Sequence, residues 1–123
     1  FVAFMESMKE MLKSVIHTHN RLTFPVSGPG SVGMETCFVN LVEPGDRVVV
    51  CVNGVFGNRM VENVKRAGGV PLILSAPWGQ GIDPAALEAF MANEAKQGPI
   101  QLTAFVHAET STGALSDAAA LCA

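Results

Sequence analysis

The run Arg-Val-Val-Val-Cys-Val at residues 47–52 constrains the fold more than any other part of this 123-residue chain. Its valines are β-branched and follow one another without the regular polar alternation of a half-exposed strand. Such a run is typical of a strand that is covered on both faces, as in a parallel sheet with helices above and below. It therefore predicts a strand that is buried on both faces.

The rest of the chain alternates between helical and strand-like patterns. Helices are expected at residues 1–19, 34–41, 56–66 and 84–95, further strands at 22–26, 70–74 and 101–106, and a last helical pattern at 117–123. Gly68-Gly69 is expected to end the third helix, and Asp83 to cap the fourth, which starts at Pro84. This order predicts an α/β fold, a three-layer α/β/α arrangement with a mostly parallel sheet.

A glycine-rich turn at residues 27–31, Ser-Gly-Pro-Gly-Ser, precedes the second expected helix. Because glycine has no Cβ, the backbone of such a turn can approach a ligand closely. The unpaired N–H groups at the start of the following helix favour a phosphate. We therefore predict a phosphate-bearing ligand at residues 27–31, with a tight turn that binds nothing as the alternative.

The residues in and after this turn narrow the kind of phosphate ligand. The spacing of Gly28, Gly30 and Gly33 fits G-x-G-x-x-G, but no Gly-Lys-Ser/Thr comes after it, which excludes a P-loop. A dinucleotide site also needs an acidic residue about 20 residues further on, at the end of the second strand. That strand ends here in Asn53-Gly54. A mononucleotide or a coenzyme phosphate is the better interpretation.

Four motifs in this order and spacing resemble the class V, fold-type I aminotransferases that use pyridoxal phosphate, the alanine–glyoxylate and serine–pyruvate group. They are Pro25-Val-Ser-Gly-Pro-Gly-Ser31 with Met34-Glu35, Asn40-Leu-Val-Glu-Pro-Gly-Asp46, Val52-Asn-Gly-Val-Phe-Gly-Asn-Arg59 and His107-Ala-Glu-Thr-Ser-Thr-Gly113. The resemblance covers residues 22–115. It implies that residues 1–123 are part of one large coenzyme-binding domain, with an N-terminal helix at 1–20 and the coenzyme-binding α/β portion at 21–123.

The resemblance implies a transaminase that moves an amino group from alanine or serine to a 2-oxo acid, glyoxylate or pyruvate, with pyridoxal 5′-phosphate as cofactor. It also implies a homodimer. The family's Schiff-base lysine and the aspartate at the pyridine nitrogen follow the Ser-Thr-Gly motif, so no catalytic residue is assigned here. The four lysines fall in helices or at helix ends: Lys9, Lys13, Lys65 and Lys96. Because the chain starts at Phe1 and stops within a helical pattern, we expect an N-terminal fragment that is inactive alone.

The resemblance assigns cofactor contacts to six residues: Gly28, Pro29, Gly30, Ser31, Phe56 and Thr110. The N–H groups of Gly30 and Ser31, with the Ser31 hydroxyl, are expected to hold the phosphate. Pro29 departs from the hydroxyl residue usual in the family and offers neither N–H nor hydroxyl. Phe56 stands where an aromatic ring, often tryptophan, stacks on the pyridine. Thr110 stands where a hydroxyl contacts the coenzyme, with Glu109 and Ser111 flanking it.

Other conspicuous side chains are expected to be structural. His107 ends an apolar strand, which predicts a packed, hydrogen-bonded histidine. Cys37 and Cys51 lie in apolar segments and are expected to be buried thiols. The three cysteines lack C-x-x-C spacing, which argues against zinc and against disulfides. Trp78 is expected to anchor a loop, and two histidines near a helix end are expected at the surface, His17 and His19.

Composition limits the partners. A hydrophobic fraction of 49% with 15% charged residues predicts that much of the chain is buried. The net charge of −3 argues against nucleic acid, and no apolar run approaches the roughly 18 residues of a membrane span. We expect a cytoplasmic protein, or an organellar one if the source is eukaryotic. The alternatives are another fold-type I enzyme, such as a cysteine desulfurase or phosphoserine aminotransferase, and a non-catalytic module that binds a phosphate ligand.

Overall fold

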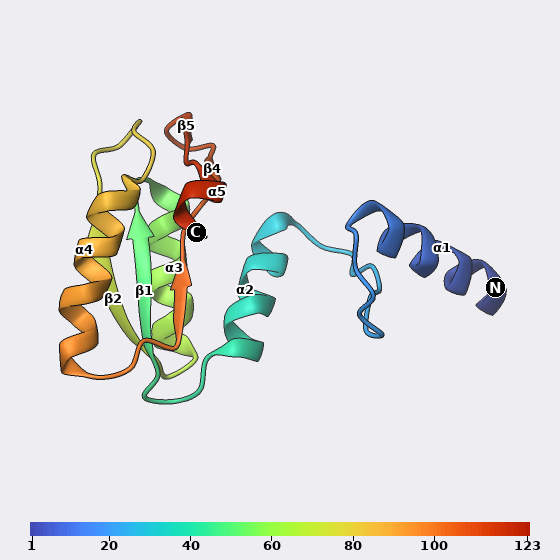
Figure 1. The fold of residues 1–123 in the computed structure, drawn as a ribbon. Helices are drawn as coiled ribbons and strands as arrows, with labels where there is room; N and C mark the ends of the chain where they lie inside the picture. Colours follow the sequence, from blue (N-terminus) through green and yellow to red (C-terminus); the bar gives the residue numbers. More distant parts are fainter.

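A computed structural model describes all residues, 1–123, and places a three-stranded parallel sheet at the centre (Figure 1). The strands are β1 (Arg47–Val52), β2 (Val70–Ser75) and β3 (Leu102–Ala104), in the order β2-β1-β3. Strand β1 pairs along its whole length with β2, and through Val48 to Val50 with β3. The run at 47–52 is therefore the middle strand, and it is buried on both faces as its composition predicted.

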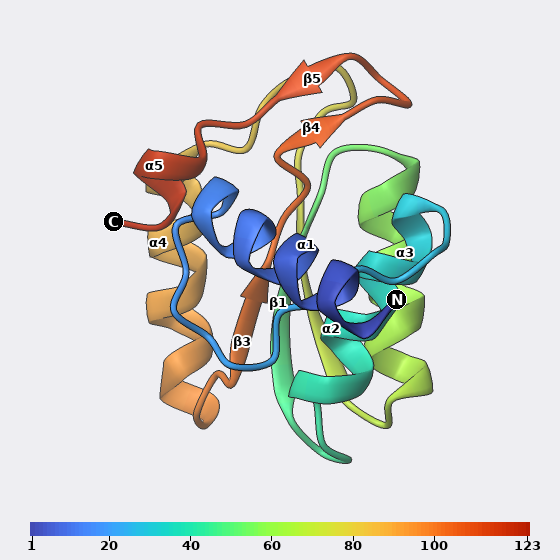
Figure 2. The ribbon, with the colours of Figure 1, turned by 90° about the vertical axis from the view of Figure 1, so that its right-hand side faces the viewer.

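Helices cover both faces of the sheet (Figures 1 and 2). On one face lie α2 (Gly30–Leu41) and α3 (Val55–Arg66), and on the other lies α4 (Pro84–Glu94). Alternate residues of β1 serve the two cores, because successive side chains of a strand point to opposite faces. Val48, Val50 and Val52 pack with α2 and α3, whereas Val49 and Cys51 pack with Ile82 and Leu87. The three-layer α/β/α prediction is confirmed.

The ends of α3 and α4 follow their sequence signals. Gly68 has φ +85°, and the Gly68 and Gly69 N–H groups donate to Lys65 and Val64 carbonyls at 3.0 and 2.9 Å. These two bonds form a Schellman motif, which glycine favours because it adopts positive φ without strain. Asp83 caps α4 by accepting the Ala85 N–H at 3.0 Å, with proline at the first helical position.

The segment around and after β3 holds elements that the sequence did not reveal. A short 3-10 helix, Ala95–Gln97, precedes β3, and β3 itself is shorter than the predicted strand 101–106. After it come β4 (Ala108–Glu109) and β5 (Ala114–Leu115), a small antiparallel pair. Each strand of the pair is two residues long, too short for an alternation pattern in the sequence. The last helix, α5 (Ala118–Leu121), lies within the helical pattern predicted at 117–123.

Two predicted boundaries near the glycine-rich turn were wrong. Residues 22–26 form no strand: they pair with no neighbour, and nearly all of them are exposed. Helix α2 begins at Gly30, four residues before the predicted start at 34, so its first turn uses the Gly-Ser-Val-Gly segment. The helix therefore starts inside the glycine-rich turn.

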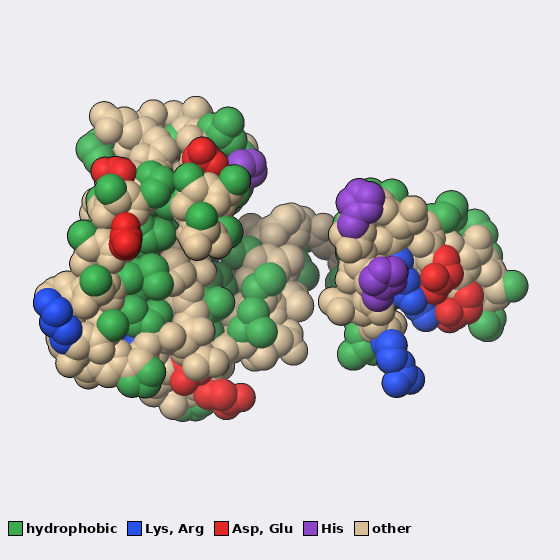
Figure 3. All heavy atoms as spheres, in the orientation of Figure 1, with side chains coloured by type: hydrophobic (Ala, Val, Ile, Leu, Met, Phe, Trp, Pro, Cys, Tyr) green, Lys and Arg blue, Asp and Glu red, His purple; other side chains and the backbone are tan.

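Helix α1 (Val2–Val15) stands away from the sheet (Figures 1 and 3). It is amphipathic as predicted, but none of its residues is buried, and Phe1 and Phe4 are 96% and 65% exposed. In the chain by itself, 19 of 123 residues are buried. None of the helices combines the length and apolar character needed to cross a membrane.

Candidate coenzyme-phosphate site

A pocket of about 460 Å³ opens at the carboxyl end of the sheet, where ligands of parallel α/β sheets bind. Its walls come from the start of α2, the first turns of α3 and the segment after β3: Gly30, Ser31, Met34, Phe56, Met60, Phe105, Val106, His107, Ala108 and Thr110. The three segments singled out in the sequence thus meet in one place.

The six predicted cofactor contacts divide into two groups. Gly30, Ser31, Phe56 and Thr110 line the pocket. Gly28 and Pro29 lie in the exposed loop that precedes it and do not form its wall. Pro29 is the N-cap residue of α2, and its carbonyl accepts the Val32 N–H at 2.9 Å. Pro29 therefore gives the helix a rigid start. A contact of Gly28 or Pro29 with a coenzyme stays a prediction.

The start of α2 offers donors suited to a phosphate. No side chain caps this 12-residue helix, and the N–H groups of Gly30 and Ser31, which precede the first helical hydrogen bond, have no protein partner. A Cβ built on Gly30 would meet nothing within 4 Å, so there is open space beside this residue. The Ser31 hydroxyl lies in the same turn and accepts a hydrogen bond from Arg59 Nη1 at 3.2 Å. These residues fit the phosphate group of a coenzyme.

A buried carboxylate fixes the opposite wall. The Glu109 side chain is fully buried, and its Oε2 accepts the Phe56 and Gly57 N–H groups at 3.1 and 3.3 Å. Its Oε1 accepts the N–H of Ser111 at 3.2 Å and also the Ser111 hydroxyl. The carboxylate thus caps α3 from a distant turn, where the helix dipole favours negative charge. The cap holds Phe56 at the edge of the pocket.

Gly54 makes room for this cap. A Cβ at Gly54 would overlap Glu109 Cγ and would lie 2.8 Å from Ser111 Oγ. In the sequence, Glu109 stands out only as a neighbour of Thr110, because no local pattern shows that a residue 53 positions away supplies the acceptor for the Phe56 N–H. A glycine directly before a helix was the only signal.

Asn53 ties the loops of neighbouring strands together beneath the site. Its side chain is fully buried, and Nδ2 donates to the Gln80 carbonyl at 2.7 Å while Oδ1 has no partner. Its own carbonyl accepts the Thr112 hydroxyl at 3.3 Å. Nearby, the buried Ser116 hydroxyl accepts the Ile82 N–H at 3.2 Å. The loops after all three strands are therefore bound to one another at the carboxyl end of the sheet.

Three predictions about single side chains were wrong. His107 is exposed at the pocket wall rather than packed, because β3 ends at Ala104 and the histidine lies beyond the sheet. Cys37 is exposed, since its neighbour Phe38 occupies the buried face of α2. Trp78 is 61% exposed and anchors no loop.

Two predictions of the same kind are confirmed. Cys51 is fully buried in β1, and burial raises the pKa of its thiol to about 11. His17 and His19 are exposed at the end of α1.

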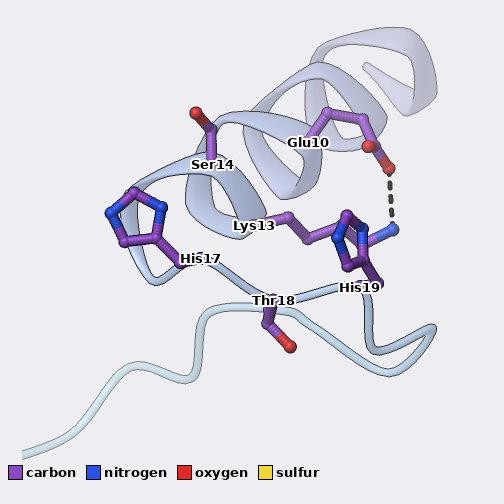
Figure 4. A pocket seen from close by; sticks show the side chains of 6 residues that line it. All are labelled: Glu10, Lys13, Ser14, His17, Thr18 and His19. Atoms are coloured by element: carbon purple, nitrogen blue, oxygen red, sulfur yellow. Dashed lines mark hydrogen bonds and ion pairs between the residues drawn. The ribbon is translucent and has the colours of Figure 1, made fainter.

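A separate hollow of about 450 Å³ at that end of α1 is lined only by polar side chains (Figure 4): Glu10, Lys13, Ser14, His17, Thr18 and His19. Lys13 donates to Glu10 at 2.8 Å, and this bond and charge lower the pKa of the Glu10 carboxyl. No group of three or more His, Cys, Asp or Glu side chains in the chain is placed to hold a metal ion. The hollow shares no residue with the pocket at the sheet.

Known proteins share this chain's sequence and fold, although no family model matches it. The (S)-ureidoglycine–glyoxylate transaminase of Bacillus subtilis is 33% identical over 113 residues, which are 92% of this chain and 26% of that protein. The crystal structure of alanine–glyoxylate aminotransferase from Nostoc sp. superposes with a TM-score of 0.84 at 39% identity, over 95% of this chain and 30% of that one. The chain is a homologue of the class V aminotransferases.

This aminotransferase homologue also resembles a protein with a different name. The soluble hydrogenase small subunit of Synechococcus sp. is 36% identical over 122 residues, 98% of this chain and 31% of that protein. The chain spans about a quarter to a third of the length of these relatives.

Proposed function

We propose that this chain forms the coenzyme-phosphate-binding part of a pyridoxal-phosphate-dependent transaminase. The observation that carries the proposal is the single pocket that gathers Gly30, Ser31, Phe56 and Thr110 at the carboxyl end of the sheet. Sequence similarity supports membership in the aminotransferase family. The grouping of these four residues supports the binding of a coenzyme at this pocket. Its donors and its aromatic ring match the two ends of a planar, phosphorylated coenzyme.

Each of these residues has a defined task in the proposal. The N–H groups of Gly30 and Ser31 and the Ser31 hydroxyl bind the phosphate, and the Phe56 ring covers one face of the planar group. The Thr110 hydroxyl, exposed at the opposite wall, supplies a polar contact at the ring edge. The coenzyme, when bound, supplies the electron sink for amino transfer. The chain's part is to bind and orient it.

The Schiff-base lysine is proposed to come from outside these 123 residues. Lys9 and Lys13 lie on α1, Lys65 lies in the last turn of α3, and Lys96 lies in the 3-10 helix. None of them lines the pocket. We therefore expect the 123 residues alone to bind without catalysing transamination.

For the acceptor we propose glyoxylate. The names of the Bacillus subtilis and Nostoc relatives differ in the amino donor but share glyoxylate, which supports it over pyruvate. For the donor we propose a small amino acid, alanine or serine, and for the assembly a homodimer.

The test is amino transfer by the protein produced from its own gene and loaded with pyridoxal phosphate. Incubation with L-alanine and glyoxylate is expected to give glycine and pyruvate in equal amounts, measured by chromatography. L-serine in place of alanine tests the second donor, and the 123-residue chain is the control without activity.

Two variants separate the proposed site from the rest of the protein. Ser31→Ala is expected to weaken pyridoxal phosphate binding, whereas Cys37→Ala, an exposed change in the same helix, is expected to leave it unchanged. Binding of the coenzyme without glycine formation would favour another fold-type I enzyme. Absence of coenzyme binding by the gene product would reject the proposal.

A further inference from the structure

The first turn of α2 is joined to α3 by one side-chain hydrogen bond. Arg59 Nη1 lies 3.2 Å from Ser31 Oγ, and the two residues are 28 positions apart in the chain. Ser31 lines the coenzyme pocket and also a neighbouring hollow of about 460 Å³, whose wall includes Arg59. The guanidinium therefore stands directly behind the proposed phosphate site.

The charge of Arg59 is not neutralised by an ion pair. Lys9, Lys13, Arg47 and Lys65 have carboxylate partners within 4 Å, and Arg59 has none. The hollow contains two carboxylates, but Glu62 is paired with Lys65 at 2.9 Å, which leaves only Glu35. The uncapped start of α2 adds the positive end of a helix dipole at the same place.

The direction of the bond determines what Ser31 can do. Arginine carries only donors, so Arg59 occupies a lone pair of the Ser31 oxygen. A serine hydroxyl has one hydrogen to donate, and this contact leaves that hydrogen free. A phosphate oxygen in the pocket is an acceptor only, which is the partner such a hydroxyl requires.

We infer that Arg59 is a positioning residue that orients the Ser31 hydroxyl as a hydrogen-bond donor to the coenzyme phosphate. The inference rests on the proposed function, because it assumes that a phosphorylated coenzyme occupies the pocket. It adds a residue outside the pocket wall to the phosphate-binding apparatus. Arg59 acts through Ser31 and touches no ligand atom itself.

The test compares two ligands that differ only in the phosphate. Pyridoxamine 5′-phosphate and pyridoxamine lack an aldehyde, so neither reacts with the lysines. Amide NMR titrations of the coenzyme-free protein produced from its own gene follow Gly30 and Ser31, and they detect weak binding. The variants are Arg59→Met, Ser31→Ala, both together, and Arg66→Met, which removes another cation of the same hollow as the matched control.

Arg59→Met is expected to weaken binding of pyridoxamine phosphate on the order of tenfold, the effect of one hydrogen bond to a charged group. Pyridoxamine binding should not change, and Arg66→Met should leave both ligands unaffected. In the Ser31→Ala background the effect of Arg59→Met should fall below about threefold, because the two residues act as a unit. Arg59→Lys should restore part of the loss, since it keeps a donor.

Three outcomes would overturn the inference, and they differ from one another. Equal losses for both ligands would show that Arg59 only maintains the packing of α2 on α3. If Arg59→Met weakens binding of pyridoxamine phosphate equally in the Ser31→Ala background, Arg59 contacts the ligand directly. If the unaltered chain does not prefer the phosphorylated ligand, the proposed function fails together with the inference.

Discussion

The Glu109 side chain packs directly against Gly54 and leaves no room for a Cβ there. The substitution Gly54→Ala, which adds one methyl group, tests this contact. In Gly54→Ala the new Cβ would overlap Glu109 Cγ, so the carboxylate must leave the Phe56 and Gly57 N–H groups. We expect a loss of about 2 kcal/mol or more in the free energy of unfolding, from overpacking and the lost cap.

Gly33→Ala is the matched control for that change. A Cβ at Gly33 meets nothing within 4 Å, and the position lies inside α2. Alanine there should raise the free energy of unfolding by roughly 0.5–1 kcal/mol, because glycine disfavours a helix interior. Urea unfolding followed by circular dichroism measures both variants. A Gly54→Ala protein as stable as the unaltered chain would contradict the tight fit.

The buried Cys51 thiol predicts a loss of stability at high pH. Its pKa rises from 9.0 to about 11 on folding, so the folded protein keeps a proton that the unfolded chain releases. Stability from this group is fully present below pH 9 and declines as pH rises toward 11. The maximum effect of this shift of two pKa units is about 3 kcal/mol.

The comparison of unaltered protein with Cys51→Ala isolates that contribution. The alanine variant has a lower stability at neutral pH because it leaves a small cavity. Its stability should decline less steeply between pH 8.5 and 11, measured by urea unfolding at each pH. Parallel pH profiles for the two proteins would show that the thiol does not cause the decline.

At the scale of elements, α1 is an independent unit. None of its residues is buried, and its charged side chains pair within the helix, Lys9 with Glu6 and Lys13 with Glu10. Met8→Pro should abolish α1, because proline clashes in a helix interior. The free energy of urea unfolding of the α/β layers should stay within about 0.5 kcal/mol of the unaltered value.

Hydrogen exchange gives the more specific measurement of the Met8→Pro protein. Amides of residues 2–15 should exchange quickly, whereas those of β1 keep their protection. Leu87→Pro is the contrasting change, because Leu87 is buried in α4 and packs against β1. Loss of protection in β1 of the Met8→Pro protein would show that α1 contributes to the core.

The elements that the sequence predicted well have local causes. The bounds of β1 matched the buried run, α3 ended just before its glycines, and α4 began directly after its capping aspartate. The hairpin of β4 and β5 depends on pairing between short segments, which leaves no local pattern. The false strand at 22–26 had strand-like composition but no neighbour to pair with.

The candidate site was partly predictable for a topological reason. Carboxyl ends of parallel strands meet at one edge, so Ser31, Phe56 and Thr110 were expected together, and the pocket unites them. Arg59 and Glu109 depend on contacts between residues 28 and 53 positions apart. Such contacts follow from the packing of whole helices, which the linear sequence does not show.

Across the whole molecule, β2 forms one edge of the sheet, and part of this edge is exposed. On β2, Val70 and Ile73 are each 47% exposed. The N–H groups of Val70 and Ala76 point inward to Asp46 and Val52 carbonyls, which places Pro71 on the outward side. Proline removes one donor from this edge and so limits its pairing with foreign strands.

The Glu109 cap also sets an order in time. During synthesis, Gly57 leaves the ribosome 52 residues ahead of the carboxylate that its N–H group will bind. At ordinary rates that interval is about 3–10 s. During this interval, the Phe56 and Gly57 N–H groups in the first turn of α3 have only water as a partner. The wall that carries Phe56 is therefore completed late, after β1, β2 and β3 have all been made.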